Sequence, residues 1–166
     1  MEDTSSQFSI SVNDLVVGFG KRVVIDHLNL DVQNGEILGL VGASGGGKSV
    51  LMRTIIGLIP RQNGRIEVMG RDIGNGQTTR SAAGKWGILF QQGALFSSLT
   101  VRQNIQFPLR ENLVLSETLM NEIATAKLEM VGLLPDDGDK FPSELSGGMI
   151  KRVALARALA LDPAIV

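Results

Sequence analysis

The stretch Gly42-Ala43-Ser44-Gly45-Gly46-Gly47-Lys48-Ser49 fits the pattern G-x-x-x-x-G-K-[ST] at every fixed position. Before it, residues 37–41 form a short apolar run that predicts a buried parallel strand. After it, apolar or small residues recur at helical spacing, at Leu51, Thr54, Ile55 and Leu58. A strand, a glycine loop and a helix in this order predict an α/β fold with a phosphate-binding loop, or P-loop, at the start of the helix.

The residue types in this loop point to phosphate chemistry. Glycines let successive backbone N–H groups turn toward phosphate oxygens, and the helix start adds unpaired donors and the positive end of its dipole. Lys48 can reach the terminal phosphates, and the Ser49 hydroxyl is placed to bind Mg²⁺. The sequence therefore predicts a site for a nucleoside triphosphate with Mg²⁺. The other binding candidates in the loop are Gly42, Ser44, Gly45, Gly46 and Gly47.

Composition narrows the classes of function. The 166 residues carry a net charge of -1 and no cysteine. This charge gives no reason to expect nucleic acid as a partner, and the lack of cysteine fits a reducing cytoplasm. Residues 1–6 are polar and unlike a signal peptide, and no apolar run approaches the about 20 residues that a membrane helix needs. We expect any membrane role to come through a partner subunit.

The region before the P-loop has the alternation of half-buried strands. One run has its apolar residues at Phe8, Ile10 and Val12, and the other has them at Leu28, Leu30 and Val32. Phe19, between glycines, fits either a base-stacking platform or a core residue at a strand end. His27, the single histidine, has no second ligand at useful spacing and is expected at the surface or in a capping role.

The region after the P-loop is expected to return to strands. Its helix should end near Gly57 and Pro60, and a turn at 63–64 should lead into a strand at 66–70. Residues 74–85 are small and polar, as in a loop. The apolar run 86–90 predicts a strand that delivers Gln91 and Gln92 at its end. Polar residues there fit a ligand site or, equally, a solvated loop.

Residues 95–145 are predicted to be helical. A helix should begin at Ser116–Glu117, with one apolar face formed by Leu119, Ile123, Ala126 and Met130. Residues 136–139 are acidic, but they lack the spacing of a calcium loop, and we expect a solvated loop.

A second helix start resembles an anion site. Ser146 is a natural N-cap, and Gly147 and Gly148 leave the helix end open. One side of this helix is formed by Ile150, Val153, Ala154, Arg157, Ala158 and Leu161. Asp162-Pro163 should end the helix, and the apolar residues 164–166 predict another buried strand.

Together these stretches resemble the nucleotide-binding subunit of an ABC (ATP-binding cassette) transporter over about residues 8–166. The resemblance rests on 42–49, 88–91 and 145–149, and the last departs from the family's L-S-G-G-Q signature at Met149. It implies a P-loop NTPase (RecA-like) core with an N-terminal antiparallel β subdomain and an inserted helical signature subdomain, truncated here. The implied division is about 8–91 for the β subdomain and core and about 92–155 for the helical subdomain.

The resemblance also implies residue roles. Phe19 lies where an aromatic ring stacks on adenine, and Gln91 lies at the Q-loop glutamine, which approaches Mg²⁺ and links the site to transmembrane subunits. Lys48 and Gln91 are therefore the catalytic candidates, and Ser49 and Gln91 are the candidates for Mg²⁺. In such proteins Ser146, Gly147 and Gly148 would hold the γ-phosphate of ATP bound to the opposite subunit of a head-to-tail dimer.

A narrower resemblance concerns residues 89–96 and 107–111, which look like the ATPases of Mce/Mla-type phospholipid (toluene-tolerance) transporters. It implies an ATPase that couples ATP binding and hydrolysis to lipid transport, bound through permease subunits to the cytoplasmic face of the inner membrane. The alternatives are a soluble ABC ATPase of DNA repair or translation, and a nucleotide-binding module without hydrolysis. A P-loop kinase would leave residues 145–149 unexplained.

The resemblance also shows what these residues omit. In the family, the strand that begins near Ile165 ends in an aspartate that supports Mg²⁺ and a glutamate that activates water, and a histidine follows later. His27 precedes the P-loop and cannot take that histidine's place. We therefore expect these 166 residues alone to bind Mg-ATP weakly and to turn over little or none of it.

Overall fold

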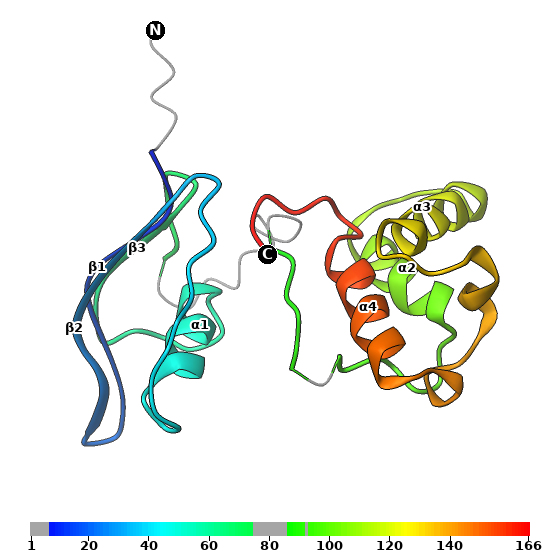
Figure 1. Cartoon of the computed structure of the whole chain (residues 1–166). Coiled ribbons are helices and arrows are strands. Elements are labelled where there is room, and N and C mark those ends of the chain that lie inside the picture. The colour runs from blue at the N-terminus through cyan, green and yellow to red at the C-terminus, as the bar shows by residue number, and fades with distance from the viewer. Residues whose placement is uncertain (1–6, 75–85, 92) are drawn as a thin grey trace, which may run out of the picture. The chain divides into compact units, whose positions relative to one another are not determined.

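The computed structural model describes residues 7–74, 86–91 and 93–166. The chain divides into two compact units, Met1–Ser81 and Ala82–Val166, which we call the β unit and the helical unit (Figure 1). The predicted loop at 74–85, apart from Gly74, and the residue Gln92 lie outside the described residues.

The β unit is built on an antiparallel four-stranded sheet in the order β2-β1-β3-β4. The strands are β1 (Phe8–Phe19), β2 (Arg22–Gln33), β3 (Asn63–Val68) and β4 (Arg71–Asp72). A turn of two residues joins β1 to β2, with Gly20 at a φ of 59° that suits glycine. The predicted antiparallel β subdomain is confirmed, and its strands run longer than the alternating stretches that signalled them.

One face of this sheet and the helix α1 (Lys48–Ile55) enclose the core of the β unit. Each large apolar side chain buried here contributes about 1.5–3 kcal/mol. The core residues are Val12, Leu15, Val17, Ile25, Leu51, Ile55, Ile66, Val68 and Ile73. Leu51, Thr54 and Ile55 are buried on α1 as predicted, whereas Leu58 lies beyond the helix end and is exposed. The helix ends just before Gly57, as expected.

The prediction of a buried parallel strand at 37–41 is wrong for this structure. These residues are not in a strand, and Ile37 and Val41 are 100% and 95% exposed. A parallel strand needs neighbours on whose backbone groups it can hydrogen-bond. Among the described residues no strand pairs with this segment, so its apolar side chains have no surface to cover them.

The strands predicted at 86–90 and 164–166 are reduced to one contact. Trp86 and Ile165 form a single parallel bridge, in which the Gly87 N–H donates to the Ile165 carbonyl at 2.7 Å. Phe90 is 53% exposed. Apolar composition identified two segments that do pair in parallel, but it overestimated how far the pairing extends.

The helical unit packs three helices with two short 3₁₀ turns. The helices are α2 (Val101–Asn112), α3 (Glu117–Met130) and α4 (Gly147–Ala158), and the turns are η1 (Pro135–Asp139) and η2 (Pro142–Glu144). Their fully buried side chains include Val101, Ile105, Leu109, Leu128 and Val153. The starts predicted for the last two helices are confirmed, because Ser116 and Ser146 are their N-caps. In the described part of the chain, no helix is both long and apolar enough to cross a membrane.

The buried face of α3 differs from the predicted one. The expected stripe through Leu119 and Met130 is largely exposed, while the helix buries Met120, Ala124, Lys127 and Leu128. Both sets follow helical spacing, so periodicity alone could not separate them. The deciding residue is Lys127, which is buried because its ammonium group has a carboxylate partner in Asp162.

Residues 136–139 form η1 and are not simply a solvated loop. Asp137 is buried, and its carboxylate accepts hydrogen bonds from the Lys140 ammonium at 2.6 Å and from the Leu134 N–H at 3.0 Å. These donors hold the pKa of the Asp137 carboxyl below its ordinary value. This acidic segment therefore has a packing role.

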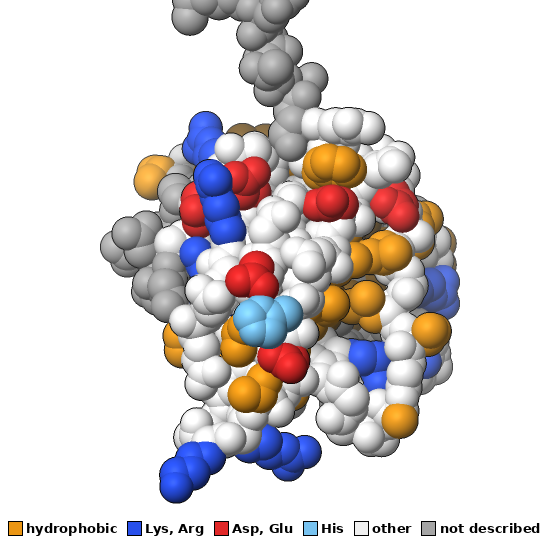
Figure 2. Space-filling view, turned by 90° about the vertical axis from the view of Figure 1, so that its left-hand side faces the viewer, with side chains coloured by type: hydrophobic (Ala, Val, Ile, Leu, Met, Phe, Trp, Pro, Cys, Tyr) orange, Lys and Arg blue, Asp and Glu red, His pale blue; other side chains and the backbone are white. Residues whose placement is uncertain are grey.

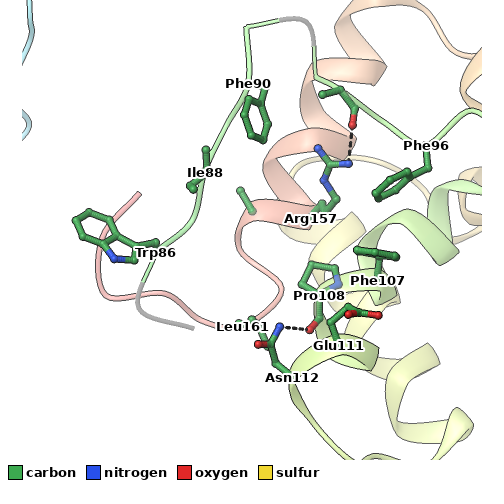
Figure 3. Close-up of a pocket in the computed structure, with 12 residues that line it drawn as sticks. Trp86, Ile88, Phe90, Phe96, Phe107, Pro108, Glu111, Asn112, Arg157 and Leu161 are labelled. Carbon is green, nitrogen blue, oxygen red and sulfur yellow. Dashed lines mark hydrogen bonds between the residues drawn. The ribbon is translucent and has the colours of Figure 1, made fainter. Parts of the chain in front are cut away.

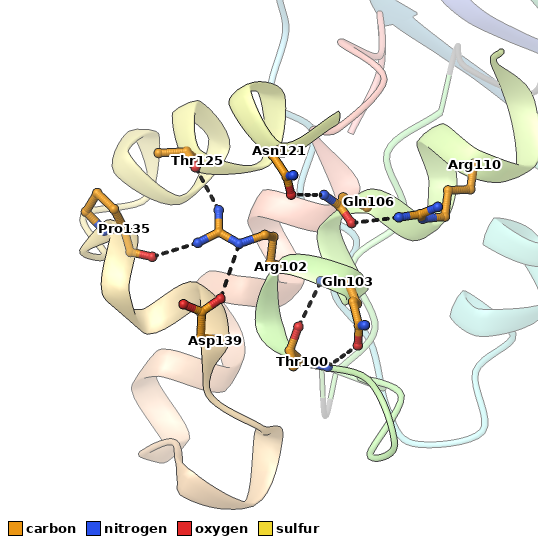
Figure 4. Close-up of polar contacts among 9 residues, drawn as sticks. All are labelled: Thr100, Arg102, Gln103, Gln106, Arg110, Asn121, Thr125, Pro135 and Asp139. Carbon is orange, nitrogen blue, oxygen red and sulfur yellow. Dashed lines mark hydrogen bonds and ion pairs between the residues drawn. The ribbon is translucent and has the colours of Figure 1, made fainter. Parts of the chain in front are cut away.

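Polar contacts join α2 to its neighbours (Figure 4). Arg102 donates to the Thr125 hydroxyl at 2.8 Å and the Pro135 carbonyl at 3.2 Å, and it pairs with Asp139. At the helix start, the Thr100 hydroxyl accepts from the Gln103 N–H, and the Gln103 side chain accepts from the Thr100 N–H. This capping box satisfies two backbone donors that the helix leaves unpaired.

Candidate functional site

The P-loop joins the exposed segment 37–41 to α1 by a tight turn. Gly45 and Gly47 have φ values of 83° and 85°, in the left-handed region that favours glycine. The Gly46 N–H donates to the Ala43 carbonyl at 3.1 Å. Ser44 and Ser49 are exposed. Two of the glycines in the motif are thus required by backbone conformation alone.

Lys48 lies over this loop. Its ammonium group donates to the Gly42 carbonyl at 2.7 Å and to the Ala43 carbonyl at 2.8 Å. An ammonium has three donors, so this arrangement leaves one for a further acceptor. The lysine is therefore held at the mouth of the loop, where an anion bound by the backbone N–H groups would meet it.

The start of α1 carries no competing acceptor. Gly47 is the N-cap and offers no side-chain hydrogen bond, and the first turn contains no acidic residue. The N–H groups of that turn and the positive end of the helix dipole thus face outward, as a phosphate site needs.

The P-loop lies against the hairpin that carries Phe19. A Cβ atom placed on Gly47 would lie 3.3 Å from Val24 Cγ1 and 3.7 Å from Ile25 Cγ1, both on β2. Phe19 closes β1 opposite Arg22, a few residues further along the same hairpin, and is 54% exposed. The alternative of a core position for Phe19 is wrong, since the ring is available to a ligand.

The start of α4 is the second candidate anion site. The Ser146 hydroxyl accepts from the Met149 N–H at 3.3 Å, which fixes the first turn. A Cβ atom on Gly147 or Gly148 would meet no atom within 4 Å, and both residues are exposed. The backbone at this helix start is therefore open to close approach.

Gln91 is exposed at the end of the segment 86–91. It lies in the helical unit with Ser146, whereas Lys48 and Phe19 lie in the β unit. The predicted site residues thus form two groups, one in each unit. In the described ranges there is no cluster of three or more His, Asp or Glu side chains that could hold a metal ion.

Sequence reasoning missed the contacts of Arg157, which it placed on one side of a helix. The guanidinium donates to the Gly93 carbonyl at 2.7 Å and to the Ala94 carbonyl at 2.8 Å, and it lies 5.9 Å from the centre of the Phe96 ring (Figure 3). Partial burial lowers the pKa of this guanidinium from its ordinary value. An arginine among apolar helix positions was the signal that could have revealed them.

An apolar pocket of about 370 Å³ lies beside this arginine (Figure 3). The Phe96 and Phe107 rings meet there with their centres 4.6 Å apart. The other residues drawn and labelled around it are Trp86, Ile88, Phe90, Pro108, Glu111, Asn112 and Leu161. Neither this pocket nor its aromatic lining was predicted, because the residues come from separate stretches of the sequence.

Both helix starts lie within a match to one protein family. The family described as "ABC transporter" matches residues 25–166. The chain belongs to the ABC transporter family. The family assignment agrees with the resemblance seen in the sequence, and it covers both the P-loop and the start of α4.

Curated relatives of this ABC protein are named for transport. The "Intermembrane phospholipid transport system ATP-binding protein MlaF" of Haemophilus influenzae is 42% identical over 97% of this chain and 61% of its own. The "Probable ribonucleotide transport ATP-binding protein mkl" of Mycobacterium leprae is 42% identical over 95% of this chain and 46% of its own. The chain thus spans about half to three fifths of the length of these relatives.

A solved structure confirms the fold class. The ATP-binding cassette MJ0796, in a dimeric post-hydrolysis state with ADP and Pi, superposes with a TM-score of 0.80 at 28% identity. The match covers 93% of this chain and 70% of that one. The fold is therefore that of an ABC ATPase cassette.

Proposed function

We propose that the chain is the nucleotide-binding part of an ATPase subunit that couples ATP binding and hydrolysis to transport across a membrane. The observation that carries this proposal is the pair of open helix starts, one with Lys48 over a glycine loop and one capped by Ser146. A kinase or a simple nucleotide-binding module uses the first of these and gives no role to the second. Family membership supports the same reading.

The nucleotide would bind along the β unit. Its phosphates would meet the N–H groups of residues 42–49 and the free donor of Lys48, and its base would stack on Phe19. Ser49 and Gln91 would hold Mg²⁺, whose chemistry is to neutralise charge on the β- and γ-phosphates. The contact of Gly47 with β2 supports this path, because it places the loop beside the hairpin whose first strand ends at Phe19.

The start of α4 would act on a second copy of the subunit. Gly147 and Gly148 expose backbone N–H groups that fit the γ-phosphate of a nucleotide held by a partner P-loop. This arrangement requires a head-to-tail dimer with two composite sites. The MJ0796 cassette, which is dimeric in its solved structure, supports this proposal by analogy.

Permease subunits would complete the transporter and hold it at the cytoplasmic face of the inner membrane. Phospholipid or another lipid is the proposed cargo, supported by the MlaF relative and by the resemblance of residues 89–96 and 107–111 to lipid-transport ATPases. A ribonucleotide is a second candidate cargo, because the relative named for ribonucleotide transport has the same 42% identity to this chain as the MlaF relative. Lipid analysis of the purified complex with its permease would separate the two.

Calorimetric titration with Mg-ATP tests the nucleotide site. We expect saturable binding that Lys48→Ala weakens by roughly tenfold or more, because a charge-assisted contact with phosphate is lost. Lys21→Ala is the matched control, since this lysine is exposed in the β1–β2 turn of the same unit. Equal affinity in the Lys48 variant and the unchanged chain would overturn the proposed site.

A further inference from the structure

The segment 93–96, which follows Gln91 closely in the chain, is hydrogen-bonded to two helices. From α4, Arg157 donates to the carbonyls of Gly93 and Ala94 at 2.7 and 2.8 Å. From α2, the buried Asn104 accepts from the Phe96 N–H at 2.8 Å and donates to the Phe96 carbonyl at 3.1 Å. A loop residue held by a buried amide in this way has little freedom to move independently of the helices.

Packing brings the same segment against the first turn of α4. Gly93 has a φ of 75°, and a Cβ atom there would lie 2.8 Å from Ile150 Cγ2, closer than any side chain could be accommodated without a shift. The Ile150 N–H in turn donates to the Ser146 carbonyl at 2.9 Å. Gly93 is therefore in contact with the turn that begins at the signature serine.

Gln91 precedes this anchor by two residues and is exposed. Its backbone can reach only positions that the fixed Gly93 allows, since two residues span at most about 7 Å. The backbone of Gln91 is thus kept within about 7 Å of a residue that contacts α4.

We propose that Arg157 is a positioning residue that holds the Gln91 segment against α4, so that the Mg²⁺ contact of Gln91 and the phosphate contact of Ser146 are placed as one body. This inference rests on the proposed function, which gives Gln91 and Ser146 their ligands. Arg157 itself touches neither nucleotide nor metal.

The chemistry of the side chain explains why an arginine is used. Its planar guanidinium presents parallel N–H groups that reach two successive carbonyls at once, and its flat face lies near the Phe96 ring. A lysine carries the same charge, but its ammonium cannot match this fork. We therefore expect Arg157→Lys to behave like Arg157→Gln and not like the unchanged chain.

The test compares ATP affinity with Mg²⁺ and with EDTA, by calorimetry on the full chain. We expect Gln91→Ala to reduce the gain in affinity that Mg²⁺ gives, by roughly threefold or more. Arg157→Gln should reduce the same gain while leaving the affinity in EDTA unchanged, because the P-loop is intact. Addition of Gln91→Ala to Arg157→Gln should reduce it no further, since both act through one contact.

Arg152→Gln is the matched control. Arg152 lies on the same helix and also donates to a backbone carbonyl, but in the described part of the chain this is the carbonyl of Gly132, at 2.8 Å, and not one in the segment 93–96. Arg152→Gln should lower the melting temperature without altering the gain in ATP affinity that Mg²⁺ gives. An equal loss of the Mg²⁺ effect in both variants, or additive losses in the double variant, would overturn the role of Arg157 and leave the nucleotide site standing. No binding to the unchanged chain would overturn the proposed function itself.

Discussion

The Lys127 ammonium, buried in α3, forms an ion pair with Asp162, which lies just beyond α4. The lysine side chain is 8% exposed and the aspartate side chain is 85% exposed. Asp162 also has a positive φ of 47°, unusual for a residue other than glycine. This ion pair links the C-terminal end of α4 to α3.

Loss of this carboxylate should destabilise the helical unit. We expect Asp162→Asn to lower the free energy of unfolding by about 1–3 kcal/mol, because the buried ammonium loses its charged partner. Glu122→Gln, an exposed position on α3, should change it by less than about 0.5 kcal/mol. Urea titration of the two variants measures the difference, and equal midpoints would contradict the role given to the pair.

The single histidine predicts a pH dependence. His27 Nδ1 contacts the Asp14 carboxylate, and this hydrogen bond raises the pKa of the imidazole above its ordinary value of 6.5. Figure 2 shows the histidine on an exposed face, beside acidic side chains. A raised pKa in the folded state gives stability that is fully present below about pH 6.5 and is lost as the pH rises through the folded pKa.

The measurement is a comparison with His27→Gln. The advantage of the unchanged chain over this variant in urea should be larger at pH 5.5 than at pH 8.5. Because the chain has one histidine, its ring protons give one NMR titration curve. A midpoint at or below the ordinary value would disprove the assignment.

Although Asn104 is polar, its substitution should lower the free energy of unfolding by a large amount. It is 0% exposed, and its amide donates to the carbonyls of Phe96, Leu99 and Thr100 at 3.0–3.1 Å. We expect Asn104→Ala to cost roughly 2–4 kcal/mol, because these carbonyls lose a buried donor and the side chain leaves a cavity. Asn112→Ala, at the exposed end of the same helix, should cost less than about 1 kcal/mol. Chemical denaturation distinguishes them, and similar losses would argue against a structural role for the Asn104 amide.

Two glycines provide a matched test of packing at the Gln91 segment. Gly93 and Gly132 have φ values of 75° and 71°, so alanine at either should cost about 1–2 kcal/mol in backbone strain. Only at Gly93 would the new methyl group clash, at 2.8 Å from Ile150 Cγ2, whereas at Gly132 the nearest atom is 3.7 Å away. Gly93→Ala should therefore cost more than Gly132→Ala. In an Ile150→Ala background, which lacks Cγ2, this excess cost at Gly93 should shrink, and an unchanged excess would place the strain elsewhere.

Local signals correctly predicted the starts of α3 and α4 and the presence of two strands before the P-loop. Ser116 and Ser146 were recognised because a capping side chain acts within three residues of its own position. Strands β1 and β2 were recognised because side chains alternate between faces, a property of the strand itself. These features need no knowledge of what lies elsewhere in the fold.

Features that depend on distant partners were not predictable. Residues 37–41 are apolar, yet burial requires neighbouring strands that periodicity does not supply. Lys127 is buried through Asp162, which lies 35 positions away. Arg157 and Gly93 are 64 positions apart, and their contact follows from packing of the helical unit. The site motifs were visible in sequence, but the residues that support them were not.

The contact between Gly47 and β2 also offers a route to engineering. The P-loop faces Val24 and Ile25 with Gly47, which has no side chain. The size of those two side chains therefore sets how closely the loop can pack against β2. A graded series at Val24, from alanine to leucine, would then tune nucleotide affinity from outside the motif. Such variants would keep every motif residue, and their nucleotide sites would fill at different ATP concentrations.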